Sequence, residues 1–137
     1  MQKSNFSILA YSILFFSSCQ PDLTCADFNI GTFHLSSDDF SEKITIIRSA
    51  NAQIEYIGGI ENGDPKKLNL KWLDECTYHL MYDESYMALG ESEKWSNDNN
   101  GVVVSKVEIR GRCMSYVAKM ITPEGKEIIR TGEMCKE

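Results

Sequence analysis

Residues 67–82 read KLNLKWLDECTYHLMY, and apolar side chains alternate with polar ones on both sides of a short acidic break. Alternation with a period of two is typical of a β-strand that has one buried face. The sequence therefore predicts two adjacent strands that form a hairpin. The inward-facing positions expected in these strands are Leu68, Leu70, Trp72, Cys76, Tyr78, Leu80 and Tyr82.

The length of the loop decides whether the two apolar sets share a face. A two-residue loop of Asp74 and Glu75 would place them on opposite faces, whereas a three-residue loop at 73–75 pairs Trp72 with Cys76 and places them together. A shift by one residue moves all side chains of a strand to the other face, so the register follows the buried face. We therefore predict the odd-length loop.

Six more runs with strand character fill most of the remaining chain. Turn signals such as Asn62-Gly63, Asn100-Gly101 and the segment 122–126 separate many of them. The runs cover residues 28–35, 44–49, 53–57, 102–109, 113–121 and 127–135. Helical turns are predicted only within 36–42 and 84–95.

About eight short strands joined mostly by hairpins indicate an all-β fold with an antiparallel, up-and-down meander. Such a meander closes into a barrel or folds into a small β-sandwich. Closure removes the exposed strand edges that invite aggregation, so the barrel is the favoured prediction.

The first 18 residues have the order of an export signal, with Lys3 first, an apolar run at 6–16 and two serines before Cys19. The run is shorter than the roughly 20 residues that span a bilayer; a buried core helix is the alternative. Ser-Ser-Cys after this run resembles a bacterial lipobox, with Phe16 at the position where Leu is usual. We expect a lipoprotein signal peptide at 1–18, a lipid on Cys19, a tether at 19–24 and a β domain at 25–137. Without the lipid, Cys19 would be a spare thiol on a secreted protein.

The chain has five cysteines, and a lipid on Cys19 leaves an even number for two disulfides in an oxidising periplasm. In an eight-stranded up-and-down barrel the other four cysteines gather at one end. Two sets of pairs then remain open: Cys25 with Cys76 and Cys113 with Cys135, or Cys25 with Cys135 and Cys76 with Cys113.

The charge of the chain limits its partners. The formal net charge is −6, and no cluster of basic residues occurs. An acidic surface repels phosphates, so we expect no nucleic-acid partner. It also gives no polybasic attraction to anionic lipid, so attachment to a membrane must be covalent.

Three segments resemble small exported bacterial lipoproteins with a lipocalin-like β-barrel: CADFNIGTFHL at 25–35, ITIIR with QIEY at 44–56, and KWLDECTYHL at 71–80. Gly31-Thr32-Phe33 stands where lipocalins carry Gly-x-Trp, and the resemblance implies that Arg130 covers Phe33. Relatives of this kind sometimes carry a topoisomerase name, which a short, acidic, exported chain does not support. The resemblance implies a ligand cavity; in a small barrel, the same side chains could instead fill the interior. The candidate lining or core residues are Phe33, Leu70, Trp72, Tyr78 and Leu80.

A search for chemistry gives no enzyme, metal or cofactor prediction. The two histidines, His34 and His79, have no zinc spacing, and the loop after Ser96 lacks the first and last ligands of an EF-hand. Cys76 follows two acidic residues, which oppose thiolate formation.

Arg48, Gln53 and Glu55 cluster near one end of the predicted 44–57 hairpin. They form either a cross-strand Arg–Glu pair or a polar recognition group at a barrel mouth.

These observations predict a lipoprotein on the periplasmic face of a bacterial membrane, with the outer membrane favoured. Its barrel would bind or chaperone a small apolar ligand. The alternative is a structural or partner-binding envelope lipoprotein with a filled barrel. Because the tether before Cys25 is short, we expect the disulfide end to face the membrane and the ligand mouth to open at the other end.

Overall fold

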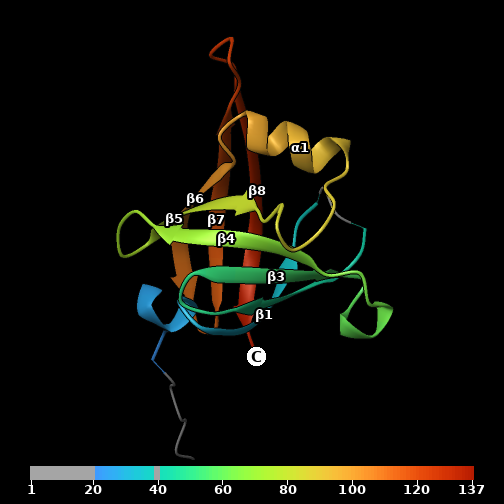
Figure 1. The fold of residues 1–137 in the computed structure, drawn as a ribbon. Helices are drawn as coiled ribbons and strands as arrows, with labels where there is room; N and C mark the ends of the chain where they lie inside the picture. Colours follow the sequence, from blue (N-terminus) through green and yellow to red (C-terminus); the bar gives the residue numbers. More distant parts are fainter. Residues whose placement is uncertain (1–20, 39–40) are drawn as a thin grey trace, which may run out of the picture.

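In the computed structural model, residues 21–38 and 41–137 are described (Figure 1). The predicted leader and Cys19 lie outside this part of the chain. Eight antiparallel strands form one closed barrel in which each strand pairs with the next and the last pairs with the first. The all-β, up-and-down barrel is therefore confirmed, and the alternative β-sandwich is wrong.

The strands lie close to their predicted positions. Their bounds are β1 (Gly31–Ser36), β2 (Ile44–Arg48), β3 (Ala52–Ile57), β4 (Lys66–Trp72), β5 (Thr77–Tyr82), β6 (Val102–Arg110), β7 (Cys113–Ile121) and β8 (Glu127–Lys136). Three short helices complete the described fold: η1 (Cys25–Phe28), η2 (Ile60–Asn62) and α1 (Glu91–Asp98).

The connection between β4 and β5 has an odd number of residues between the paired positions, as predicted, but it is longer than predicted. Leu70 lies opposite Leu80, and Trp72 lies opposite Tyr78, so the apolar sets share the inner face. The predicted pairing of Trp72 with Cys76 is wrong because residues 73–76 form a loop and Trp72 lies opposite Tyr78. In this loop the Leu73 N–H donates to the Thr77 carbonyl at 2.9 Å, and the Cys76 N–H donates to the Asp74 carboxylate at 2.8 Å.

The helical segments differ most from the sequence predictions. The first predicted strand began at Phe28, but this residue ends η1, where Thr24 and Asp27 form a capping box. The helix predicted within 84–95 lies further along the chain, at Glu91–Asp98. The described residues of 36–42 form strand, turn and bends, with no helix.

Both disulfides lie at the same end of the barrel. Cys25 bonds to Cys76 with a Cα–Cα distance of 5.3 Å, and Cys113 bonds to Cys135 with 4.0 Å. This is the first of the two predicted sets of pairs, so the second set is wrong. The Leu23 N–H donates to the Gly111 carbonyl at 2.9 Å, which holds the entering chain against the β6–β7 turn of this end.

The barrel has two different ends, visible in Figure 1. At the end called the closed end here, η1 lies at the barrel rim, tied to it by the Cys25–Cys76 disulfide, and its buried Phe28 ring stacks on Phe33 at 5.7 Å between centroids. At the open end, α1 lies beside the barrel rim and the β7–β8 hairpin projects past it. Asn97 of α1 accepts from the Tyr82 N–H at 2.9 Å and donates to its carbonyl at 3.0 Å.

The closed half of the interior is packed with side chains. Its core includes Phe28, Phe33, Leu70, Met114 and Met134, all buried. Burial of large apolar groups is the dominant favourable term in folding, so this half carries much of the stability. Among the described residues, no helix has the length and hydropathy needed to cross a bilayer.

Candidate functional site

The open half of the barrel contains a cavity of about 270 Å³. Apolar side chains that alternate along the strands form most of its wall: Leu35, Ile44, Ile46, Ile57, Leu68, Leu80, Val102, Val104 and Ala118. Tyr78, Tyr82 and Tyr116 add aromatic surface. Ser96 of α1 also lies on the wall, so the helix borders the cavity.

The predicted lining residues divide between the two halves of the barrel. Tyr78 and Leu80 lie on the cavity wall, together with Gln53 and Glu55 from the predicted polar group. Phe33, Leu70 and Trp72 lie outside the wall, in or against the core. The sequence prediction missed most of the wall from β2, β6 and β7. Period-two alternation in β7, where Met114, Tyr116 and Ala118 face the interior, is a signal that could have found part of it.

Tyr116 reaches the wall because its cross-strand neighbour is a glycine. It lies opposite Gly132, and a Cβ atom at Gly132 would collide with the Tyr116 hydroxyl. The phenol ring therefore occupies the space above the glycine, as aromatic residues often do beside glycines in sheets. Gly132 thus has a packing role that its chain position alone does not show.

A buried chain of polar groups extends from the closed half to the cavity. Arg48 donates to the Gln53 carbonyl oxygen from Nε at 3.0 Å and from Nη2 at 2.5 Å. Gln53 Nε2 in turn donates to Glu55 Oε1 at 2.7 Å. The predicted direct Arg–Glu pair is therefore wrong, because Arg48 lies opposite Gln53 and Glu55 lies opposite Ile46. Arg48 and Gln53 are not at a mouth, since each is only 2% exposed, whereas Glu55 is partly exposed on the cavity wall.

Arg48 is enclosed by neutral groups. Its Nη1 donates to the Phe28 carbonyl at 2.8 Å, and its guanidinium carbon lies 4.4 Å from the Tyr78 ring centroid and 5.4 Å from that of Phe33. Cation–π contacts of this kind stabilise a desolvated guanidinium. Arg48 therefore takes the place over Phe33 that the resemblance gave to Arg130. The β8 register places Lys136 beside Phe33 and Arg130 further along, at the cavity wall.

Burial changes the acid–base properties of the interior. It raises the pKa of the Glu55 carboxyl, and the Gln53 hydrogen bond and the Arg48 charge oppose the rise only in part. Burial also raises the pKa of the Tyr78 and Tyr82 phenols, and the Glu55 charge adds to both effects. Both tyrosines therefore remain neutral hydrogen-bonding groups at ordinary pH.

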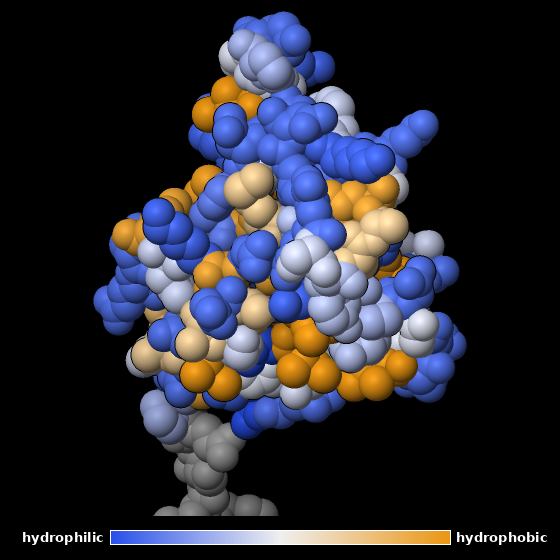
Figure 2. Space-filling view, viewed as in Figure 1, coloured by the Kyte–Doolittle hydropathy of each residue, from blue (hydrophilic) through white to orange (hydrophobic). Residues whose placement is uncertain are grey.

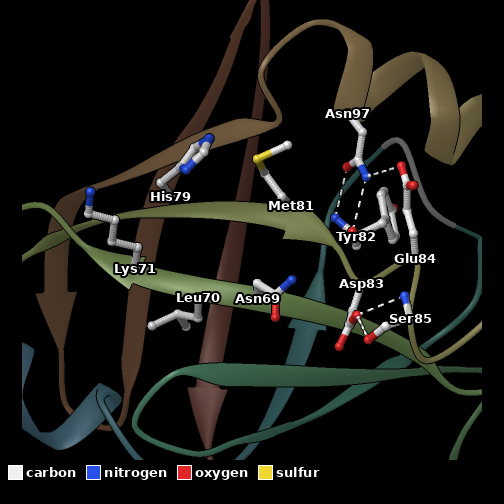
Figure 3. A pocket seen from close by; sticks show the side chains of 10 residues that line it. All are labelled: Asn69, Leu70, Lys71, His79, Met81, Tyr82, Asp83, Glu84, Ser85 and Asn97. Carbon is white, nitrogen blue, oxygen red and sulfur yellow. Dashed lines mark hydrogen bonds between the residues drawn. The ribbon is translucent and has the colours of Figure 1, made fainter.

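A second depression lies on the outer wall between β4, β5 and α1 (Figure 3). Its polar side chains bind one another. Asp83 accepts from Ser85 Oγ at 2.6 Å and from Lys67 at 2.9 Å, and His79 lies 2.5 Å from the Asn100 carbonyl. These bonds attach α1 and its entering segment to the barrel. The depression is best explained as a structural junction.

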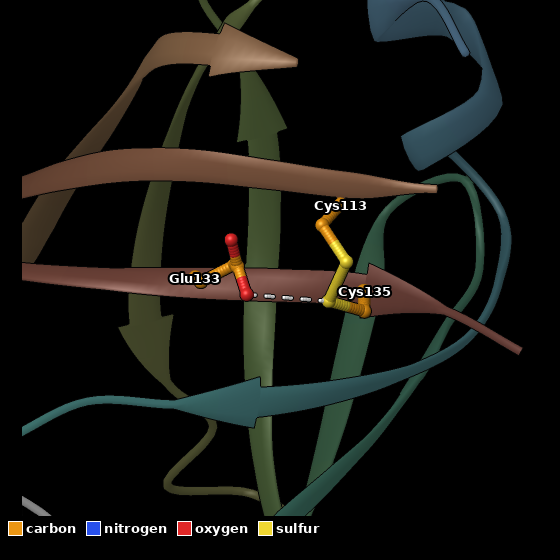
Figure 4. Close-up of side chains that lie close together, drawn as sticks. All are labelled: Cys113, Glu133 and Cys135. Atoms are coloured by element: carbon orange, nitrogen blue, oxygen red, sulfur yellow. Dashed lines mark hydrogen bonds between the residues drawn. A yellow bond between two sulfur atoms is a disulfide. The ribbon is translucent and has the colours of Figure 1, made fainter. Parts of the chain in front are cut away.

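The cluster of Cys113, Glu133 and Cys135 has the spacing of metal ligands (Figure 4). Both sulfurs are joined in a disulfide, and Cys135 Sγ lies 3.6 Å from Glu133 Oε1. A metal ion needs thiolate ligands, which an intact disulfide cannot supply. This cluster is therefore a cross-link between adjacent strands.

No protein-family model, curated protein or solved structure matches the chain. Its class thus follows from the architecture, which is a disulfide-containing, eight-stranded antiparallel barrel of lipocalin-like form. The two disulfides indicate an oxidising compartment outside the cytoplasm.

Proposed function

We propose that this protein is a lipid-anchored lipoprotein of the bacterial periplasm whose barrel binds a small apolar ligand. The observation that carries the proposal is the cavity of about 270 Å³ in the open half, with its mostly apolar wall. Ligand sites in proteins are concave and mainly apolar, with a few polar groups that orient the ligand.

The cavity volume sets the size of the ligand. An apolar cavity of about 150 Å³ is enough to hold benzene. The larger space here suits a ligand with two fused rings or a chain of medium length. The filled closed half of the barrel leaves no room for a longer molecule, so the ligand is small.

The position of the tether supports a membrane-proximal closed end. Residues 19–25 span at most roughly 20 Å when extended, and Cys25 is fixed at the closed end by its disulfide. A lipid on Cys19 would hold this end toward the membrane, with the outer membrane favoured. The cavity would then open on the side that faces away from the membrane.

The test is a titration with N-phenyl-1-naphthylamine, a neutral dye that fluoresces in apolar surroundings. The protein is the full chain with Cys19→Ser, purified from the periplasm without detergent. We expect saturable binding of one dye per chain. Ala118→Phe should weaken the binding at least tenfold because the new ring enters the cavity.

The matched control is Val107→Phe, which adds a similar ring to an exposed position of β6 and should leave binding unchanged. A lack of saturable binding, or equal weakening by both variants, would contradict the proposal.

A further inference from the structure

The polar groups of the barrel interior offer an incoming ligand a hydrogen-bond acceptor. Glu55 lies on the cavity wall, and Arg48 does not. Arg48 is 2% exposed, and its guanidinium is bound to Gln53, to the Phe28 carbonyl and, at 3.7 Å, to the Met134 sulfur. A ligand in the cavity therefore meets the Glu55 carboxyl and not the Arg48 guanidinium, while the other cation of the wall, Arg130, belongs to an exposed residue of β8.

The orientation of Gln53 follows from Arg48. A guanidinium can only donate hydrogen bonds, so the Gln53 atom that receives two of them is its carbonyl oxygen. The Gln53 amide nitrogen must then face Glu55, which accepts on Oε1. One carboxyl oxygen is thus held in place by the chain of bonds that begins at Arg48. In the described part of the chain no hydrogen bond occupies Oε2.

We propose, as an extension of the ligand-binding function proposed above, that the ligand is a small apolar amine whose protonated nitrogen binds the Glu55 carboxylate. The apolar body would lie against Ile46, Leu80 and Val104, and the ammonium would donate to Glu55 in the low-dielectric interior. Charge-assisted hydrogen bonds are the strongest of the ordinary hydrogen bonds.

The charges around the cavity agree with a cationic ligand. The formal net charge of −6 draws cations toward the protein and repels carboxylates. The titratable or hydrogen-bonding groups that face Glu55 or share its cavity wall include Gln53, Tyr78, Tyr82, Tyr116 and Arg130, with Arg48 behind Gln53. Burial favours a proton on Glu55 in the empty cavity, and an ammonium would replace this proton without changing the interior charge.

The experiment compares four compounds with one skeleton: 1-naphthylmethylamine, 1-naphthalenemethanol, 1-methylnaphthalene and 1-naphthoic acid. Calorimetry at pH 7.5 measures their binding to the full chain with Cys19→Ser. We expect the amine to bind about tenfold or more tightly than the hydrocarbon and the acid. Its affinity should fall as the pH is lowered through the raised pKa of Glu55.

Glu55→Gln should weaken binding of the amine about tenfold and leave that of 1-methylnaphthalene within twofold. The control is Glu108→Gln, which changes a glutamate on the outside of β6 and should have no effect. A thermal melt checks that both variants fold. If Glu55→Gln does not fold, the comparison of the four compounds on the unchanged barrel still tests whether the barrel prefers the amine.

If the neutral dye binds, three results would overturn this inference alone. They are tighter binding of the acid than of the amine, equal binding of the amine and the hydrocarbon, and a folded Glu55→Gln variant with full amine affinity. If neither the dye nor any of the four compounds binds, the proposed function is overturned and this inference with it.

Discussion

Arg48 is a permanent charge held inside the barrel, and in the described part of the chain no carboxylate contacts it directly. Gln53 lies between the guanidinium and the carboxyl of Glu55, so the opposite charge acts at a distance. The uncharged contacts with Phe28 and with three aromatic rings make up for part of the lost hydration. Arg48 thus joins η1, β2 and β3 in one arrangement of hydrogen bonds.

Replacing Arg48 should therefore be costly. Arg48→Met leaves the buried Phe28 and Gln53 carbonyl oxygens without their donor. We expect a loss of about 2–5 kcal/mol in the free energy of unfolding, since each buried acceptor left without a partner costs about 1–3 kcal/mol. Urea denaturation measures it. Arg110→Met, at a side chain that is 82% exposed, should change stability by less than about 0.5 kcal/mol. Similar values for the two variants would contradict this account of Arg48.

At the residue scale, the sequence predicts which polar side chains lie near one another but not how they are bonded. The clustering of Arg48, Gln53 and Glu55 could be predicted from a 44–57 hairpin. Their order in the hydrogen-bond chain could not, because it depends on Arg48 lying opposite Gln53. The choice between Arg48 and Arg130 over Phe33 depends on how far β8 is staggered against β1, which no local pattern encodes.

At the scale of elements, the strands were predictable and their connections were not. Period-two alternation predicted β4 and β5, and strand character bounded by turn signals predicted the other six. The 73–76 loop and η1 could not be predicted because their conformations depend on side-chain bonds to the backbone, such as those of Asp74 and Asp27. The choice between a cavity and a filled barrel also could not be made, because it depends on which half of the barrel receives the largest side chains.

The junction of β5 with the segment leading to α1 should respond to acid. Hydrogen bonds from Ser85, the largest effect, and from Lys67 lower the pKa of Asp83 to about 2, from an ordinary value of 3.8. The lowered pKa means that the stabilisation by Asp83 is complete above about pH 4 and is lost as the pH falls toward 2. We expect the chain to be more stable than Asp83→Asn at pH 6, with the difference vanishing near pH 2.

Thermal melts across this pH range measure the difference. Asp98→Asn, at an exposed aspartate of α1, is the matched control and should show a much smaller difference. A stability difference for Asp83→Asn that stays constant down to pH 2 would contradict the assignment.

For the whole molecule, both ends of the described chain meet at the closed end. The last residue is fixed there, since the Glu137 N–H donates to the Thr32 carbonyl at 3.0 Å. Figure 2 shows mostly polar side chains over the projecting hairpin and apolar groups, some of them adjoining, over the lower barrel wall of the visible face.

The lipid proposal predicts the location of a variant. Cys19→Ser removes the acceptor of the lipid, so the protein should move from the membrane fraction to the soluble periplasmic fraction after cell fractionation. Ser17→Ala keeps a small residue and the cysteine, and it should stay with the membrane. Mass spectrometry of the N-terminus reports the lipid directly. A membrane-bound Cys19→Ser protein, or an unmodified Cys19 in the native protein, would contradict the anchor.

The position of the C-terminus decides where a reporter can be attached. A fusion after Glu137 would lie beside η1 and the disulfides. If the proposed lipid holds this end at the membrane, the fusion would compete with the bilayer for that space. The turn at 122–126 lies at the far tip of the β7–β8 hairpin, where Gly125 adopts a φ of +81° and a side chain would meet no neighbouring atom within 4 Å of its Cβ. With the proposed anchor, an epitope inserted there would stand clear of the lipid surface, so labelling of cells with a permeabilised outer membrane could read out the orientation of the barrel.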